Sequence, residues 1–158
     1  MKGLIHSFGY AINGIFTAIK NERNFRIHLV CMAYMYFFLL RYDFFEVSKT
    51  QFAVIFLANA LVIAAELINT AVESCVDLYG EEHTAYGKTA KDTAAAAVLI
   101  TAIFAVLVGV ATLFQPDAFK SLFEYAVSHI LFIVGFIVSV ILFTIFIFFG
   151  LGKNEKDK

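Results

Sequence analysis

One apolar segment carries a row of polar side chains along a single side, and this feature constrains the fold more than any other. The segment runs from Phe52 to Gly80, and its polar positions lie three or four residues apart. In an α-helix, at about 100° per residue, they cover an arc of only about 80°. An ionised carboxylate near a bilayer core costs roughly 2.5–3.5 kcal/mol, so we expect a partner, an ion or a reaction to use it. This acidic row consists of Glu66, Asn69, Glu73 and Asp77.

The composition places the chain in a membrane. Of its 158 residues, 61% are hydrophobic and 16% are charged, and the mean hydropathy is +0.81. Soluble domains carry about 25% charged and 45–50% apolar residues. We therefore predict an all-α integral membrane protein. The net charge of −1 and the lack of a basic run in the sequence give no reason to expect a nucleic-acid partner.

Four membrane spans are predicted from the apolar runs. Thr93–Phe114 and Ile130–Gly152 are uncharged and exceed the roughly 20 residues that cross a bilayer. The run Phe52–Ala65 reaches a full span only if it includes the acidic row. The run Ile27–Leu40 is long enough for a full span only if the Arg41 side chain extends its charged end to the membrane interface. The predicted spans are 26–42, 50–79, 88–114 and 130–152, with a loop at 80–87.

The segment Leu4–Ile19 is amphipathic. Its larger apolar side chains fall within about 120° of one another on a helix, and polar side chains lie on the other side. The pattern is typical of a helix lying flat in the membrane interface, and a helix packed on the bundle fits it equally well. The apolar side comprises Leu4, Ile5, Phe8, Ile12, Ile15, Phe16 and Ile19.

The distribution of positive charge predicts the orientation. With the N-terminus in the cytoplasm, nine of the twelve Lys and Arg residues fall on the cytoplasmic side, as the positive-inside tendency favours. Glu66 then lies near the inner hydrocarbon boundary, and Asp77 lies in the headgroup or aqueous layer. Pro116 ends the third span. The predicted divisions are a membrane domain at 1–115, an outer segment and additional span at 116–152, and a polar tail at 153–158.

The cysteines and histidines suggest no separate site. Cys31 and Cys75 lie in apolar helical contexts without a CxxC partner, so we expect small buried side chains rather than redox groups. The four histidines are scattered and do not have the spacing of a zinc site.

Three polar clusters meet on the predicted cytoplasmic side: the segment Glu22–His28, the acidic row, and Lys88 with Lys91 and Asp92. Together they supply acidic side chains that could bind a divalent cation, basic side chains that could bind phosphate, and a carboxylate at membrane depth. Magnesium prefers a few carboxylate oxygens plus substrate phosphates. Phosphoryl transfer needs positioning, charge neutralisation and a group that accepts the hydroxyl proton. The set is sufficient for a kinase that acts on a lipid alcohol.

Other interpretations compete with this one. Interfacial Glu and Arg side chains often pair only to fix helix register, which would make the protein a non-catalytic assembly factor. Acids within the membrane also mark ion or proton paths, but a transporter predicts acids spread through the bilayer depth. Here they cluster on one side.

The polar clusters resemble the prokaryotic diacylglycerol kinase family, which includes the undecaprenol kinases. The resemblance covers roughly residues 7–114 and is highly specific, because several blocks occur at the family's spacing. They are Glu22-Arg23-Asn24-Phe25-Arg26-Ile27-His28, Glu66-Leu67-Ile68-Asn69-Thr70-Ala71-Val72-Glu73, Val76-Asp77, and Lys91-Asp92 with the alanines that follow.

The resemblance implies a fold and a place. It implies three-span protomers with an amphipathic surface helix, assembled as a homotrimer in the bacterial inner membrane, with the active site on the cytoplasmic side. The span at 130–152 lies outside that pattern, so this chain is expected to carry an extra C-terminal fourth transmembrane helix.

The resemblance also implies residue roles. Glu22 and Glu73 would hold Mg²⁺ that bridges the ATP phosphates, and Glu66 would be the general base toward the lipid hydroxyl. Asn69 would help to orient that base or the γ-phosphate. The nucleotide contacts would come from Lys91 and Asp92, with Asp77 nearby.

The substrate that the resemblance implies is a lipid alcohol, phosphorylated by direct in-line transfer from ATP. The stretch Glu22–Leu29 resembles the undecaprenol kinase branch more than the diacylglycerol kinase branch, which favours undecaprenol. Diacylglycerol is the alternative, and phosphatidic acid would then be the product.

Overall fold

The chain is all-helical where its structure is described. The computed structural model describes residues 2–78 and 84–150, and these ranges contain six α-helices and no strand. The predicted tail at 153–158 lies outside the described residues. The all-α prediction is confirmed. The helices are α1 (Lys2–Asn21), α2 (Arg23–Arg41), α3 (Lys49–Asp77), α4 (Ala85–Leu113), α5 (Pro116–Ser128) and α6 (Ile130–Phe149).

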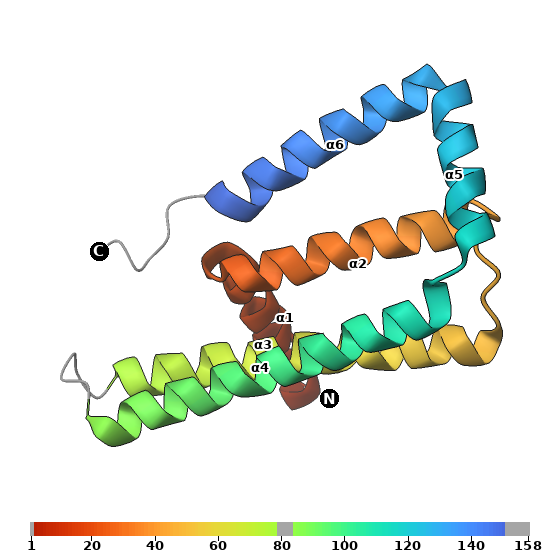
Figure 1. Cartoon of the computed structure of the whole chain (residues 1–158). Helices are drawn as coiled ribbons and strands as arrows, with labels where there is room; N and C mark the ends of the chain where they lie inside the picture. The colour runs from red at the N-terminus through yellow and green to blue at the C-terminus, as the bar shows by residue number, and fades with distance from the viewer. Residues whose placement is uncertain (1, 79–83, 151–158) are drawn as a thin grey trace.

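The long helices run alongside one another. The α5 helix crosses the end where α4 leads into α6, and α1 passes behind the α3–α4 pair partway along its length (Figure 1). The most extensive contact joins α3 to α4, which lie antiparallel. The α2 helix contacts α3 on one side and α6 on the other, so it lies between the α3–α4 pair and α6. The end of α1, the start of α2 and the end of α6 lie together, whereas the start of α4 extends beyond them (Figure 1).

Three of the described helices, α3, α4 and α6, are long and apolar enough to cross a membrane. An integral membrane protein is thereby confirmed. The α2 helix does not reach the same hydropathy, because Arg26, His28 and Arg41 lie along its 19 residues. That α2 also crosses the bilayer stays a prediction from the sequence; the helix lies beside α3 (Figure 1).

Local sequence signals account for the helix ends. Ser48 begins α3 with a capping box, because its Oγ accepts from Gln51 N and the Gln51 side chain accepts from Ser48 N. Thr84 caps α4 by accepting from Gly87 N at 3.0 Å. The predicted loop at 80–87 is therefore wrong at its end: residues 85–87 are helical, and residues 79–83 lie outside the described ranges.

Few of the described side chains are buried, as expected of helices that place their apolar side chains in hydrocarbon. The buried apolar side chains line the helix contacts; Phe25 is 1% exposed and Ile55 is 2% exposed. Cys31 and Cys75 are exposed, so the prediction that they are buried is wrong. Both lie on helix sides that no neighbouring helix of the described chain covers.

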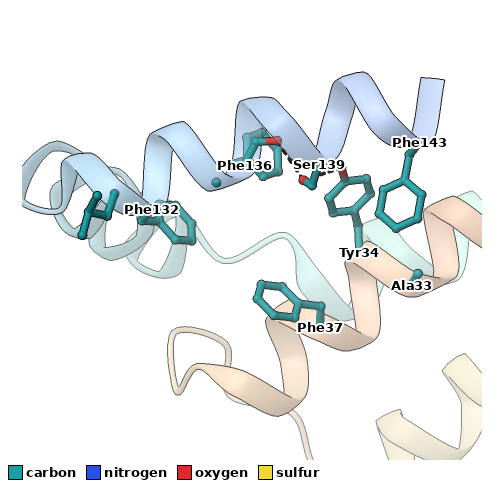
Figure 2. Close-up of a pocket in the computed structure, with 9 residues that line it drawn as sticks. Ala33, Tyr34, Phe37, Phe132, Phe136, Ser139 and Phe143 are labelled. Atoms are coloured by element: carbon teal, nitrogen blue, oxygen red, sulfur yellow. Dashed lines mark hydrogen bonds between the residues drawn. The ribbon is translucent and has the colours of Figure 1, made fainter. Parts of the chain in front are cut away.

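Aromatic side chains and one hydroxyl pair join α2 to α6 (Figure 2). Ser139 Oγ donates to Phe136 O, so the 2.9 Å contact between Tyr34 Oη and Ser139 Oγ has the tyrosine as donor. The Tyr34 ring meets Phe136 and Phe143 edge-on, at centroid distances of 5.6 and 5.3 Å. These residues border a largely apolar cavity of about 450 Å³.

The Tyr34–Ser139 bond should contribute little to stability. Interhelical hydrogen bonds in membrane proteins average about 0.6 kcal/mol in double-mutant cycles. We therefore expect Tyr34→Phe, Ser139→Ala and the double variant to give a coupling energy of about that size, measured by reversible unfolding in mixed micelles. A coupling energy near zero would mean that α6 is held on α2 without this bond.

Candidate active site

Most of the acidic row opens into one cavity between three helices. The cavity has a volume of about 350 Å³ and is polar on its α2 and α3 walls and apolar on its α4 wall. The row therefore faces neighbouring helices rather than the surroundings of the chain. The lining residues are Asn24, Ile27 and His28 from α2, Glu66, Asn69 and Glu73 from α3, and Ala95, Val98, Leu99 and Ala102 from α4.

Glu66 is the most deeply buried acid of the row. It is 2% exposed, and its neighbours one turn before it on α3 are apolar. His28 Nε2 lies 3.3 Å from Glu66 Oε1. That contact does not meet hydrogen-bond geometry, so this oxygen has no hydrogen-bond partner among the residues that the structure describes. A buried carboxylate is costly unless it is paired, and His28 is the cationic or donor group placed to pair with it.

Asn69 and Glu73 form a pair one and two turns further along α3. Asn69 Nδ2 donates to Glu73 Oε1 at 2.9 Å, the contact expected of side chains four residues apart on a helix. Asn69 Oδ1 is buried and has no hydrogen-bond partner within the described ranges. Buried acceptors are normally satisfied, so this oxygen is available to a donor or cation that enters the cavity.

Asp77 and Lys91 form an ion pair between α3 and α4, beyond the cavity. Lys91 Nζ donates to Asp77 Oδ1 at 2.5 Å, and the two side chains are 28% and 55% exposed for Lys91 and Asp77. Exposed pairs of this kind contribute little to stability. Neither residue lines the cavity, and neither does the exposed Asp92 next to Lys91.

Glu22 lies at the corner between α1 and α2. It is the N-cap residue of α2 with an extended backbone, and its carboxylate interacts favourably with the charge of Arg26. Glu22 does not line the cavity that holds Glu73. The cavity is therefore lined by only one of the two predicted metal ligands, Glu73.

The oxygen atoms in the cavity suit a magnesium ion that is also bound to phosphate, rather than a metal ion held only by protein ligands. No group of three or more His, Cys, Asp or Glu side chains in the described ranges is close enough to hold a metal. Mg²⁺ usually keeps several waters and binds through one or two carboxylates plus substrate phosphates. Glu73 and the unpaired Asn69 oxygen meet that requirement.

The sequence interpretation missed two residues of the cavity. Asn24 and His28 belong to a cluster that the sequence singled out, but neither was assigned to the site. They lie four residues apart on α2, so they share a face, and that spacing was the available signal. Only the packing of α2 on α3 reveals that this face meets Glu66.

The arrangement suits chemistry between an apolar alcohol and a soluble anion. The polarity of the row changes along α3, from Glu66, which is buried beside apolar residues of α4, to Asp77, which is exposed and paired with Lys91. An apolar molecule that carries a hydroxyl would find apolar side chains of α4 beside the buried carboxylate. A phosphate-bearing molecule would find exposed charged side chains at the opposite end of the row.

The chain belongs to the prokaryotic diacylglycerol kinase family. The family's sequence model, described as "Prokaryotic diacylglycerol kinase", matches residues 9–113. The match contains α2, α3 and α4, and with them every residue that lines the cavity. Helices α5 and α6 lie outside it.

Curated relatives include enzymes of both substrate types. The chain is 40% identical over 114 residues to a diacylglycerol kinase of Synechocystis, covering 72% of this chain and 63% of that relative. It is 36% identical over 105 residues to an undecaprenol kinase of Bacillus subtilis, covering 65% of this chain and 81% of that relative. A diacylglycerol kinase of Haemophilus influenzae is 37% identical, with 61% and 80% covered. No solved structure matches the chain.

Proposed function

We propose that this protein is a lipid kinase that transfers the γ-phosphoryl group of ATP to the hydroxyl of a membrane lipid alcohol. The observation that carries the proposal is the buried carboxylate of Glu66, which lies in a cavity with polar walls from α2 and α3 and an apolar wall from α4. Membership of a family of lipid kinases supports the same reaction class.

Undecaprenol is the proposed substrate, with diacylglycerol as the alternative. The proposal rests on the stretch Glu22–Leu29 and is compatible with the similarity to the Bacillus undecaprenol kinase. The similarity to diacylglycerol kinases is of the same order, so identity alone does not separate the two alcohols. A long isoprenoid and two acyl chains are equally compatible with an apolar wall.

The proposed mechanism is a single in-line displacement. The lipid hydroxyl oxygen forms a bond to the γ-phosphorus while the bond from that phosphorus to the β,γ-bridging oxygen breaks, and ADP leaves. Glu66 accepts the hydroxyl proton, which the 3.3 Å contact with His28 helps by orienting the carboxylate. Asn69 positions the base or the γ-phosphate through the side-chain oxygen that has no hydrogen-bond partner within the described ranges.

The remaining polar residues are proposed to bind the nucleotide. Glu73 and Glu22 would hold Mg²⁺, which neutralises phosphate charge when bound. Lys91, Asp92 and Asp77 would contact the nucleotide at the exposed end of the row. Because Lys91 and Asp77 pair with each other here, nucleotide binding would exchange that pair for contacts with phosphate.

The cellular setting is part of the proposal. We infer a multi-pass protein of the bacterial inner membrane, with the active site on the cytoplasmic side, where ATP is present. The homotrimer and the division of the chain near residue 115 stay predictions.

The reaction can be tested directly. Purified protein, incubated with labelled ATP and Mg²⁺ in mixed micelles, should phosphorylate undecaprenol in preference to diacylglycerol at equal mole fraction. Preference for diacylglycerol would change the substrate and keep the reaction. Failure to label any lipid alcohol, with ATP hydrolysed or bound normally, would contradict the proposal.

Removing the base should separate chemistry from binding. Glu66→Gln keeps the size of the side chain and loses the proton acceptor, so phosphorylation should fall by about 10²–10⁴-fold, the contribution of a positioned general base. The affinity for MgATP should stay within a factor of two, measured by equilibrium binding. Glu124→Gln, an exposed position on α5, is the matched control and should behave as the wild type. Equal loss of turnover and MgATP affinity would show that Glu66 is not the base.

Removing the proposed metal ligand Glu73 should weaken MgATP binding, in contrast to Glu66→Gln. Glu73→Ala removes a carboxylate from the cavity, so the affinity for MgATP should fall at least tenfold, and a higher Mg²⁺ concentration should restore part of it. Glu46→Ala, an exposed acid in the loop between α2 and α3, is the control. Wild-type MgATP binding by Glu73→Ala would remove Glu73 from the ligand set.

A further inference from the structure

Arg26 joins three helices through one buried guanidinium. The residue is 3% exposed although it lies in the first turn of α2. Its Nη1 donates to Ile19 O and Lys20 O, each at 2.9 Å, and its Nε donates to Ile147 O at 3.0 Å. The first two carbonyls end α1 and the third belongs to the last turn of α6. A helix leaves its last carbonyls without internal partners and carries partial negative charge there, so one cation satisfies two helix ends.

The end of α6 is shaped to reach this guanidinium. Gly150 ends the helix with φ +61° and ψ −152°, a conformation that residues other than glycine rarely adopt. A Cβ atom at this position would lie 3.1 Å from Arg26 Nη1 and 3.3 Å from Lys20 O. Both the backbone conformation and the space therefore require glycine where α6 meets Arg26.

The same guanidinium lies next to the proposed catalytic residues. Glu22, at the corner between α1 and α2, interacts with the charge of Arg26. Asn24 and His28 flank Arg26 two residues away on either side, and both line the cavity that contains Glu66. A shift of the first turn of α2 would therefore move Glu22, Asn24 and His28 together.

We propose that α6 is an intramolecular clamp for the active site, in which Arg26 is a positioning residue that uses the end of α6 to fix the corner between α1 and α2. The clamp involves a helix that lies outside the family match, which ends at residue 113. Its kinetic consequence rests on the proposed function, because it concerns the place of Glu22 relative to bound MgATP. Its structural part stands without that function.

The test uses the same substitution at two places on α6. Gly150→Ala places a methyl group against Arg26, whereas Gly135→Ala meets nothing within 4 Å and is the matched control. Both are made in the full chain with Cys31→Ala and Cys75→Ala, so that spin labels attach only at introduced cysteines. Arg26→Ala is a second variant that removes the clamp from the other side.

The structural readout is the distance between α1 and α6. Asn13→Cys and Phe148→Cys, both at exposed positions, carry the labels, and labelled chains are diluted with unlabelled chain so that distances within one chain dominate. Pulsed electron–electron double resonance should give one narrow distribution of label-to-label distances for the unsubstituted background and for Gly135→Ala. Gly150→Ala and Arg26→Ala should broaden it. An unchanged distribution in Gly150→Ala would overturn the clamp.

The kinetic readout compares the KM for MgATP with the KM for the lipid alcohol. Gly150→Ala should raise the KM for MgATP about tenfold, the effect of losing one hydrogen bond to a charged group, and leave the KM for the lipid alcohol within twofold. A broadened distance with an unchanged MgATP dependence, or an equal rise in both constants, would overturn the positioning role while the kinase function stands. If the unsubstituted background phosphorylates no lipid alcohol, the proposed function fails, and the distance measurement still decides the clamp.

Discussion

The structure depends on one constraint, which is the presence of a buried carboxylate in a helix long and apolar enough to cross a membrane. Glu66 is 2% exposed, and hydrocarbon offers a charged or hydrogen-bonding side chain no partner. The helix must therefore turn this side toward other helices. The polar first turns of α2 supply His28 as a partner, and apolar side chains of α4 form the opposite wall of a cavity. The acidic row is thus kept out of lipid and open to a ligand.

The surroundings of the acidic row change from one end of the row to the other. Along α3 the side chains pass from a buried carboxylate, through an amide and a second acid, to an exposed ion pair with α4. This order places apolar surroundings at one end of the row and exposed charged side chains at the other, as the proposed reaction between a lipid alcohol and a nucleotide requires. Outside the family match, α5 and α6 add a second contact surface to α2, and α6 ends on the arginine that holds the corner beside the site.

The sequence predicted some residues of the site and some helix boundaries correctly and missed others. The arc formed by Glu66, Asn69 and Glu73 follows from helical periodicity, and the structure confirms that these three share one cavity. Asn24 and His28 were not assigned to it, because periodicity within α2 does not say which helix its face will meet. The helical start at Ala85 was missed because a single threonine cap decides it, and the exposure of the two cysteines was missed because apolar context does not indicate burial in a membrane protein.

The sequence by itself determined that the chain is helical, that it is a membrane protein and that its polar row occupies one side of one helix. These properties depend on hydropathy and on residue spacing, which are local. Tertiary structure alone decided that His28 contacts Glu66, that Glu73 but not Glu22 lines the cavity, and that Arg26 satisfies the ends of two helices. Those contacts join residues from separate helices, and the packing angles and registers that bring them together are set by many weak contacts at once, which no local pattern encodes.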